Sequence, residues 1–218
     1  MSDQLVSPTF LFRFAWRCQR RDEPWTARGM ALDEACRLPA LAADLEGAST
    51  FADVRAAWSP AGLVFNVRVA GKKQLPWCRH DRCEDSDGLQ VWIDTRDTHN
   101  VHRASRFCHR FVFLPTGSGR TREEPTAGQL LINRARENPP PARPGLLAAR
   151  SEKRVDGYVL EAFVPAAALT GYAPEDHPRL GFFYAVHDRE LGWQTLSVGL
   201  EFPFPEDPSV WGTLELAE

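Results

Sequence analysis

The sequence predicts an all-β protein, an antiparallel β-sandwich of about ten strands with one short helix and a long loop rich in Pro and Arg. Short segments in which apolar and polar residues alternate are separated by Gly and Pro, which is typical of strands joined by turns. Thirteen Phe and seven Trp against two Met indicate a core of stiff aromatic rings, which suits pleated sheets.

The totals limit the class of protein. An apolar fraction of 43% is enough for a packed core and argues against disorder. The net charge of −3 gives no reason to expect a nucleic-acid partner, and no segment is long and apolar enough to cross a bilayer. We therefore expect neither nucleic acid nor a membrane as partner.

The amino-terminal segment has an acid near its start and Arg13 inside its apolar run, so it lacks the layout of a secretory signal. Five cysteines cannot all pair with one another. Together these features predict reduced thiols in a cytoplasmic protein.

The first half of the chain predicts a strand and a hairpin. Phe10, Phe12, Phe14 and Trp16 alternate with smaller or charged residues, which predicts a first strand with one aromatic face. Two strand-like runs, 54–58 and 63–69, flank Ser59-Pro60-Ala61-Gly62 and predict a hairpin.

The second half adds a central strand at 87–95, another strand at 107–114 and a second hairpin, whose turn is Val155-Asp156-Gly157. Pro165 to Leu169 predicts the one short helix. The remaining predicted strands are 146–152, 158–164, 180–188, 195–198 and 211–216. Residues 115–144 are interpreted as an excursion, interrupted by a short strand at 130–132, within a single domain spanning 1–218, because neither side carries a self-sufficient set of strands.

The stretch 77–110 is the predicted site-bearing centre. It holds four of the six histidines, and polar and aromatic residues crowd both ends of its central strand. A rigid strand flanked by such loops is a common way to mount a binding site.

Several motifs in order carry a family resemblance. The chain resembles the family 9 carbohydrate-binding modules and their relatives in the DOMON-like group of β-sandwiches. The matching segments are Leu32-Asp33-Glu34, the 54–69 hairpin, Asp85 to Asp94, Gly157 to Ala162, Leu180 to Phe183 and Trp211 to Leu214. The resemblance implies non-catalytic sugar binding between two aromatic rings with polar side chains around them.

By position, Trp77 and Trp193 match that pair of rings, and an indole suits the role because the apolar C–H face of a pyranose can lie flat on it. Gln90 matches a polar contact on the central strand, and Arg106 or Arg110 an arginine of the following strand. The predicted partner is a small carbohydrate or the end of a polysaccharide. The polar contacts are predicted to come from Arg79, His80, Asp85, Gln90 and Arg106.

The same resemblance implies structural calcium, for which Asp94 and Asp97 are the predicted ligands; no other cofactor is expected. Zinc is an alternative on Cys78, His80 and Cys83 with the later pair Cys108-His109. The spacing is irregular, and neighbours on a strand point to opposite faces, so buried thiols and surface imidazoles explain these residues better.

Two rival functions stay open. One is a protein-interaction module that docks a partner through the basic loop 120–143. The other is a metal-dependent hydrolase with a carboxylate pair made of Glu161 and either Asp87 or Asp188. The sequence contains no phosphate loop, nucleophile elbow or metalloprotease motif, so we favour a protein that is not an enzyme.

Overall fold

The computed structural model describes residues 12–23, 25–27, 29–30, 32–46 and 50–217. Strands dominate these residues, which confirms the predicted all-β class. No helix of this part of the chain is both long and apolar enough to cross a membrane. The strands are β1 Ala15–Arg20, β2 Ala52–Ser59, β3 Gly62–Ala70, β4 Gly88–Asp94, β5 Cys108–Ser118, β6 Glu124–Leu130, β7 Ala148–Arg154, β8 Gly157–Pro165, β9 Arg179–Asp188, β10 Gly192–Thr195 and β11 Gly212–Ala217.

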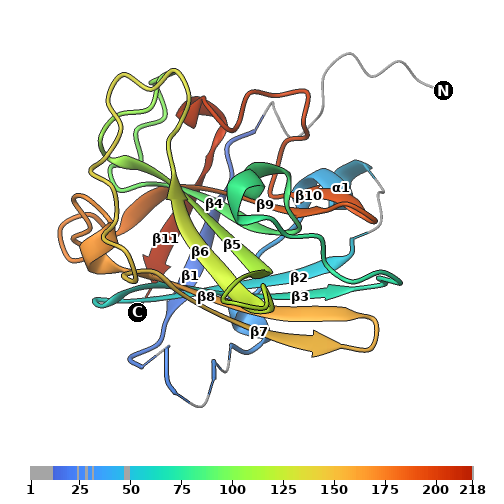
Figure 1. The fold of residues 1–218 in the computed structure, drawn as a ribbon. Coiled ribbons are helices and arrows are strands. Elements are labelled where there is room, and N and C mark those ends of the chain that lie inside the picture. Colours follow the sequence, from blue (N-terminus) through green and yellow to red (C-terminus); the bar gives the residue numbers. More distant parts are fainter. Residues whose placement is uncertain (1–11, 24, 28, 31, 47–49, 218) are drawn as a thin grey trace.

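These strands form one hydrogen-bonded sheet in the order β6-β5-β4-β9-β11-β1-β2-β3-β8-β7, with β10 paired to β9. The sheet folds over on itself, so that β4, β5, β6, β9 and β10 lie across from β2, β3, β7 and β8 (Figure 1). We call these two sets of strands the β4 layer and the β3 layer. Strands β6 and β7, at the two ends of the path, also contact each other, which nearly closes the sheet.

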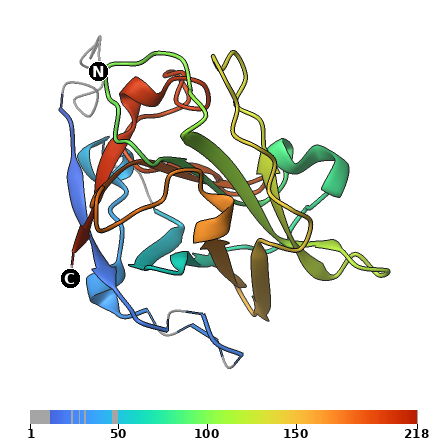
Figure 2. The ribbon, with the colours of Figure 1, turned by 90° about the vertical axis from the view of Figure 1, so that its left-hand side faces the viewer.

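The prediction of a purely antiparallel arrangement is wrong at one place. Strand β1 runs parallel to both of its neighbours, β11 and β2. Figure 2 shows β1 in blue beside β11 in red. A parallel pair needs a long connection, and the segment 21–51 between β1 and β2 supplies one.

The core lies between the two layers. In β4, Leu89, Val91 and Ile93 are fully buried, and the alternate residues Gln90, Trp92 and Asp94 are buried as well, so both faces of this strand are covered. Phe65 of β3 stacks on Phe182 of β9 with ring centroids 5.9 Å apart and planes within 5°, and so joins one layer to the other. Aromatic burial of this kind is the largest favourable contribution to such a fold.

The predicted hairpins 54–69 and 146–164 are confirmed as β2–β3 and β7–β8. Three predicted elements shift, one of them the strand 195–198, which overlaps β10 only at Thr195. Residues 1–11, where the first strand was predicted to begin, lie outside the described residues, and β1 begins only at Ala15; the predicted helix 165–169 is the three-residue 3-10 helix η4, Ala166–Ala168. The other short helices were not among the predicted elements. They are η2 Glu34–Cys36, α1 Leu41–Glu46, η3 His80–Asp85 and η5 Pro208–Val210.

The predicted excursion 115–144 contains a full strand. β5 extends to Ser118, and β6 pairs with it in a hairpin, where the sequence suggested only a short strand at 130–132. The segment after β6 is held in place by the side chains of Asn138, which bonds the backbone of Ile132, and Gln129, which accepts from Ala142. Gly and Pro in this region hid the strand, because both are rare inside strands.

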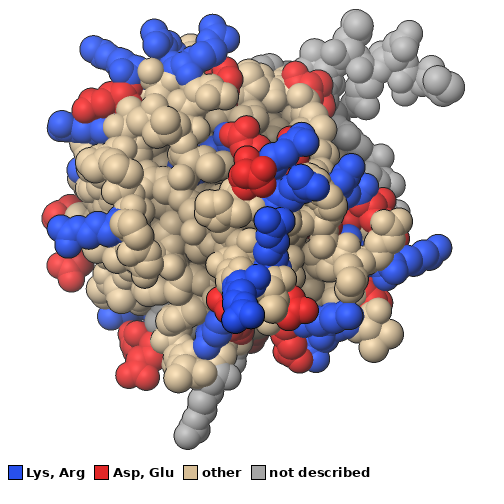
Figure 3. All heavy atoms as spheres, viewed as in Figure 1, with Lys and Arg blue, Asp and Glu red and all other residues tan. Residues whose placement is uncertain are grey.

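Charges of both signs are interspersed on the face shown in Figure 3, and neither sign forms a continuous field there. Elsewhere in the described residues, charges form local pairs, such as the exposed Arg154 with Glu152 at 2.8 Å. Exposed pairs of this kind contribute little to stability.

The β2–β3 turn requires a glycine. Gly62 has φ of +141°, and a Cβ there would clash with the carbonyl oxygen of Val164 and lie 2.8 Å from Pro165 Cα. We predict that Gly62→Ala lowers the free energy of unfolding by about 2–3 kcal/mol in urea titrations. The control is Gly128→Ala in β6, where the nearest atom would be Val112 Cγ1 at 3.6 Å; equal losses in the two variants would contradict the clash.

Candidate functional site

The two tryptophans predicted from the sequence lie at the same end of the β4 layer, where β4 begins. Trp77 precedes β4 and exchanges two hydrogen bonds with Asp87: its amide donates to Oδ2 at 3.0 Å, and its carbonyl accepts from the Asp87 amide at 2.9 Å. Trp193 lies on β10 opposite His187 of β9, and His187 in turn lies opposite Gly88, the first residue of β4. Both indoles therefore lie near the start of one strand.

Each ring has a cationic or titratable neighbour. Trp193, which is 37% exposed, stacks on the His187 imidazole with centroids 4.3 Å apart. Trp77 is half-buried, and the Arg189 and Arg79 guanidinium carbons lie 4.3 and 5.4 Å from its ring centroid. His187 and Arg189 are two residues apart, so the end of β9 connects the surroundings of the two indoles.

A buried ion cluster fixes this end of the layer. The ammonium of Lys72 lies 3.1 Å from Asp87 Oδ2 and 2.5 Å from Asp188 Oδ2, and all three side chains are at most 2% exposed. Glu190 stands 3.9 Å away, and its carboxylate accepts from the amides of Lys73 and Gln74. Charges this deeply buried are tolerated only when they are paired and hydrogen-bonded.

Backbone amides complete the cluster and tie the site loops to it. Asp87 Oδ1 accepts from the amide of Arg189 at 2.8 Å, and Asp188 Oδ1 accepts from Glu190 and Leu191 at 3.0 and 3.1 Å. Burial by itself would lower the pKa of Lys72, but its bonds to Asp188 and Asp87 outweigh this and raise it. The ammonium therefore stays charged at neutral pH and holds the segments around Trp77 and Arg189 together.

A second polar group lies on the outer face of the β4 layer. Gln90 and Arg110 are buried, and Gln90 Oε1 accepts from Arg110 Nη2 at 2.7 Å. Glu84, on η3, accepts from Arg110 Nη1 at 2.8 Å and, through its carbonyl, from Gln90 Nε2 at 3.2 Å. Burial lowers the pKa of Arg110, against the effect of Glu84, without removing its charge. These bonds seat η3 against β4 and β5.

The predicted contacts Arg79, His80 and Asp85 lie in or beside η3 and are exposed. Arg79 is anchored through its backbone, since its amide donates to Ser86 Oγ at 2.9 Å. Asp85 pairs with Arg82 at 2.6 Å. These residues thus lie at the same end of the β4 layer as Trp77 and Gln90.

Arg106 lies at the opposite end of the layer. It precedes β5, whose first residue, Cys108, pairs with Asp94, the last residue of β4, and its guanidinium lies over Phe107. A seven-residue strand is about 20 Å long. Arg110, the other arginine that the resemblance indicated, is the one that contacts Gln90.

Asp94 and Asp97, the predicted calcium ligands, also lie at that far end. Asp94 is buried, which raises its pKa, and accepts from the amides of Arg96 and Thr98 at 3.0 and 2.7 Å. Burial opposes ionisation of Asp97, but bonds from His99, Thr213 and Arg179 lower its pKa. Each carboxylate thus has donors from the protein itself, and the described residues contain no group of three or more His, Cys, Asp or Glu arranged for a metal, so calcium has no support here.

The residues of the zinc alternative lie at two opposite ends of the β4 layer. Cys78 and Cys83 lie near η3, and their thiols donate to the carbonyls of Asp87 and His80. Cys108 and His109 are the first two residues of β5, at the opposite end of the β4 layer from η3. Burial lowers the pKa of His109 to about 4, and its Nε2 accepts from the Thr170 amide at 3.0 Å. This imidazole is a neutral core group stacked on Phe111.

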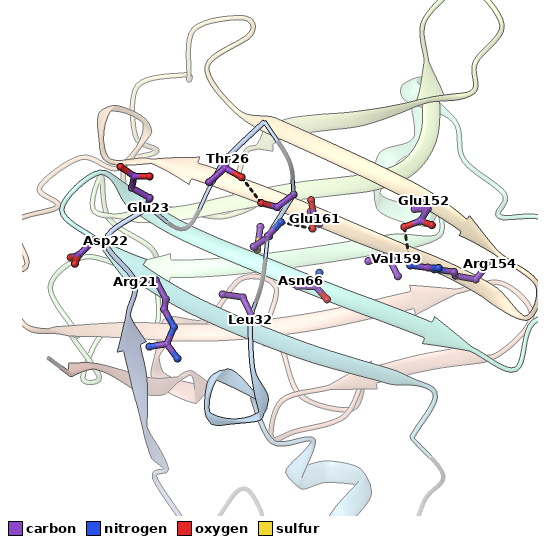
Figure 4. Close-up of a pocket in the computed structure, with 12 residues that line it drawn as sticks. Arg21, Asp22, Glu23, Thr26, Leu32, Asn66, Glu152, Arg154, Val159 and Glu161 are labelled. Atoms are coloured by element: carbon purple, nitrogen blue, oxygen red, sulfur yellow. Dashed lines mark hydrogen bonds and ion pairs between the residues drawn. The ribbon is translucent and has the colours of Figure 1, made fainter.

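The two carboxylates of the hydrolase alternative do not form a pair, because they lie on different layers. Glu161 lies on the outer face of the β3 layer, where it accepts from the Met30 amide at 2.9 Å (Figure 4). Asp87 and Asp188 are held by Lys72. Glu161 borders a hollow of about 720 Å³ that Asn66 and Val159 help to line. Trp25, in the segment that crosses this hollow, packs on Phe163 and under Arg150.

Three residues of the site carried no signal in the sequence alone. Lys72 follows a glycine at the end of a hairpin and has the appearance of a surface lysine, and Glu84 and Arg189 lie in charged turns. No residue next to Lys72 marks it as buried, because its partners are Asp87, just before β4, and Asp188, at the end of β9.

No protein-family model and no curated protein sequence matches the chain. Solved structures do. A family 9 carbohydrate-binding module from Caldicellulosiruptor kristjanssonii, in complex with glucose, is similar with a TM-score of 0.61 and 11% identity over 94% of this chain and 96% of that one. The cellotriose complex gives a TM-score of 0.60 and 12% identity, with 93% of each chain covered. The fold is therefore that of family 9 carbohydrate-binding modules, as the sequence motifs predicted.

The ion cluster makes Lys72 a stability determinant. Lys72→Met leaves two carboxylates in the interior with no counter-ion, and we predict a loss of about 3–5 kcal/mol in the free energy of unfolding. Because the folded-state pKa of Lys72 is raised above 10.5, its contribution is complete below that pH and is lost as the pH rises through the folded value. Urea titrations of wild type, Lys72→Met and the exposed control Lys73→Met test this; similar losses in both variants would contradict it.

Because of His109, we predict that the protein loses stability in mild acid. Its pKa is about 4 in the folded chain and 6.5 without the fold, so the unfolded chain gains the proton first as the pH falls. Stability should drop by about 2 kcal/mol between pH 7 and pH 5 because of this one group. In His109→Gln, whose amide oxygen can still accept from Thr170, this part of the pH dependence should vanish from urea titrations at the two values; an unchanged dependence would contradict the assignment.

Proposed function

We propose that this protein binds a saccharide without transforming it, at the end of the β4 layer where Trp77 and Trp193 lie. The observation that carries the proposal is the common attachment of the two indoles to the start of β4, through Asp87 on one side and His187 on the other. Indoles held at one end of a rigid layer can take the apolar face of a sugar ring.

Polar groups suited to hydroxyls surround the indoles. Arg79, His80 and Asp85 are exposed beside Trp77, and Gln90 lies deeper with Arg110 and Glu84. Fixed donors and acceptors of this kind supply orientation and specificity in a ligand site. Arg110 takes the role that the sequence suggested for Arg106, because Arg110 is the one that contacts Gln90.

The structural comparison supports the same proposal. The similar modules are described in complex with glucose and with cellotriose, and they cover nearly the whole of this chain. A fold by itself does not determine function, so the proposal rests on the tryptophans and their polar neighbours.

Calorimetric titration with a panel of mono- and disaccharides tests the proposal. We predict that Trp77→Ala and Trp193→Ala each weaken the best ligand about tenfold or more, which corresponds to about 1.4 kcal/mol. Trp25→Ala, in the segment over the β3 layer, is the matched control and should leave affinity unchanged. Unaltered binding in both site variants, or no binding of any sugar to the wild type at millimolar concentration, would overturn the proposal.

A further inference from the structure

Trp77 is bordered by two arginines that have no acidic partner. The guanidinium carbons of Arg189 and Arg79 lie 4.3 and 5.4 Å from its ring centroid. Among the residues that the structure describes, no carboxylate oxygen lies within 4 Å of either guanidinium, and both side chains belong to exposed residues. Two full positive charges thus flank one indole.

Three other cations at this end of the layer have carboxylate partners. Arg82 pairs with Asp85 at 2.6 Å, Arg110 with Glu84 at 2.8 Å, and Lys72 with Asp87 and Asp188. The carboxylate of Glu190 is engaged by the amides of the 73–74 backbone. Asp81 is the exposed acid of η3 that could offset part of the charge. Glu190 and the second carboxylate beside Lys72 offset further charge at this end, so Arg79 and Arg189 stand out because no carboxylate contacts them, and not because of an excess of positive charge.

From this charge arrangement we infer that the ligand of the site is an acidic sugar, one that carries a carboxylate on its ring as a hexuronic acid does. This inference rests on the saccharide proposal and specifies its ligand class. Both guanidinium groups lie over Trp77, Arg189 closer to the ring centre than Arg79. A pyranose that displaces Arg189 from the ring face would keep both groups within reach of a substituent at its edge. Guanidinium is the side chain best suited to a carboxylate, because its planar N–H groups match the two oxygens.

Arg189 is placed to exchange its contact with the Trp77 indole for a contact with a bound sugar. Its contact with the indole is an exposed cation–π interaction, which is weak, and its long side chain can leave the ring while its backbone amide stays bound to Asp87. The anchored backbone keeps the charge at the edge of the site when a sugar takes the ring face.

The test compares two ligands that differ only in charge, glucuronic acid and glucuronamide, by calorimetry at neutral pH. We expect the acid to bind about five- to tenfold more tightly at low ionic strength, and the difference to shrink in 0.5 M salt, because exposed ion pairs are screened. Arg189→Gln and Arg79→Gln should each reduce the preference for the acid, and the double variant should remove it. Arg82→Gln, which loses an arginine already paired with Asp85, is the matched control and should keep the preference.

The outcomes separate this inference from the proposed function. Equal affinity for acid and amide, with binding still dependent on Trp77 and Trp193, would overturn the acidic-ligand inference and leave the saccharide proposal standing. If glucuronic acid, glucuronamide and neutral sugars all fail to bind, the acidic-ligand inference and the saccharide proposal are both overturned. Both arginines are exposed, so the variants should melt with the wild type; a lower melting temperature together with a lost preference would point to a structural role and count against the inference.

Discussion

The ammonium of Lys72, held between the carboxylates of Asp87 and Asp188, is the interaction on which the site end of the molecule depends. Lys72 supplies the counter-charge for both carboxylates. Asp87 also accepts from the amides of the loop residues Trp77 and Arg189, and Asp188 accepts from those of Glu190 and Leu191. A hydrophobic contact would hold these loops together with less directional control, because apolar packing is not directional. The ion cluster therefore couples the folding of the interior to the geometry of the surface above it.

The inner and outer faces of the two layers carry different groups. Packing of rings such as Phe65 on Phe182 joins the layers and leaves their outer faces for other groups. On the β4 layer the outer face carries the polar group of Gln90 and Arg110, which η3 covers through Glu84. On the β3 layer the outer face carries Glu161 and its neighbours (Figure 4). The tryptophans proposed for sugar binding lie on the layer whose loops the ion cluster orders.

Local patterns predicted the strands where one face is apolar and the turn is explicit, as in the 54–69 hairpin. They failed at β6, whose residues Glu124–Leu130 include Pro and Gly and no alternation, because pairing with β5 rather than its own composition makes it a strand. For the candidate site, the polar contexts of Trp77 and Trp193 predicted loop positions, and the structure places both residues near the start of β4. The sequence could not decide between Arg106 and Arg110, since both flank the start of β5 and only the register of that strand separates them.

By itself the sequence determined the all-β class, the hairpins, the buried face of the central strand and the resemblance to family 9 carbohydrate-binding modules, because each depends on periodicity or on short ordered motifs. Only the tertiary structure decided that β1 runs parallel to both neighbours and that Lys72 is buried. It also decided which charges near Trp77 are left without a partner. The pairing of β1 with β11 and the contact of Lys72 with Asp188 each join segments more than a hundred residues apart, and no local pattern records which distant residue will supply a counter-ion.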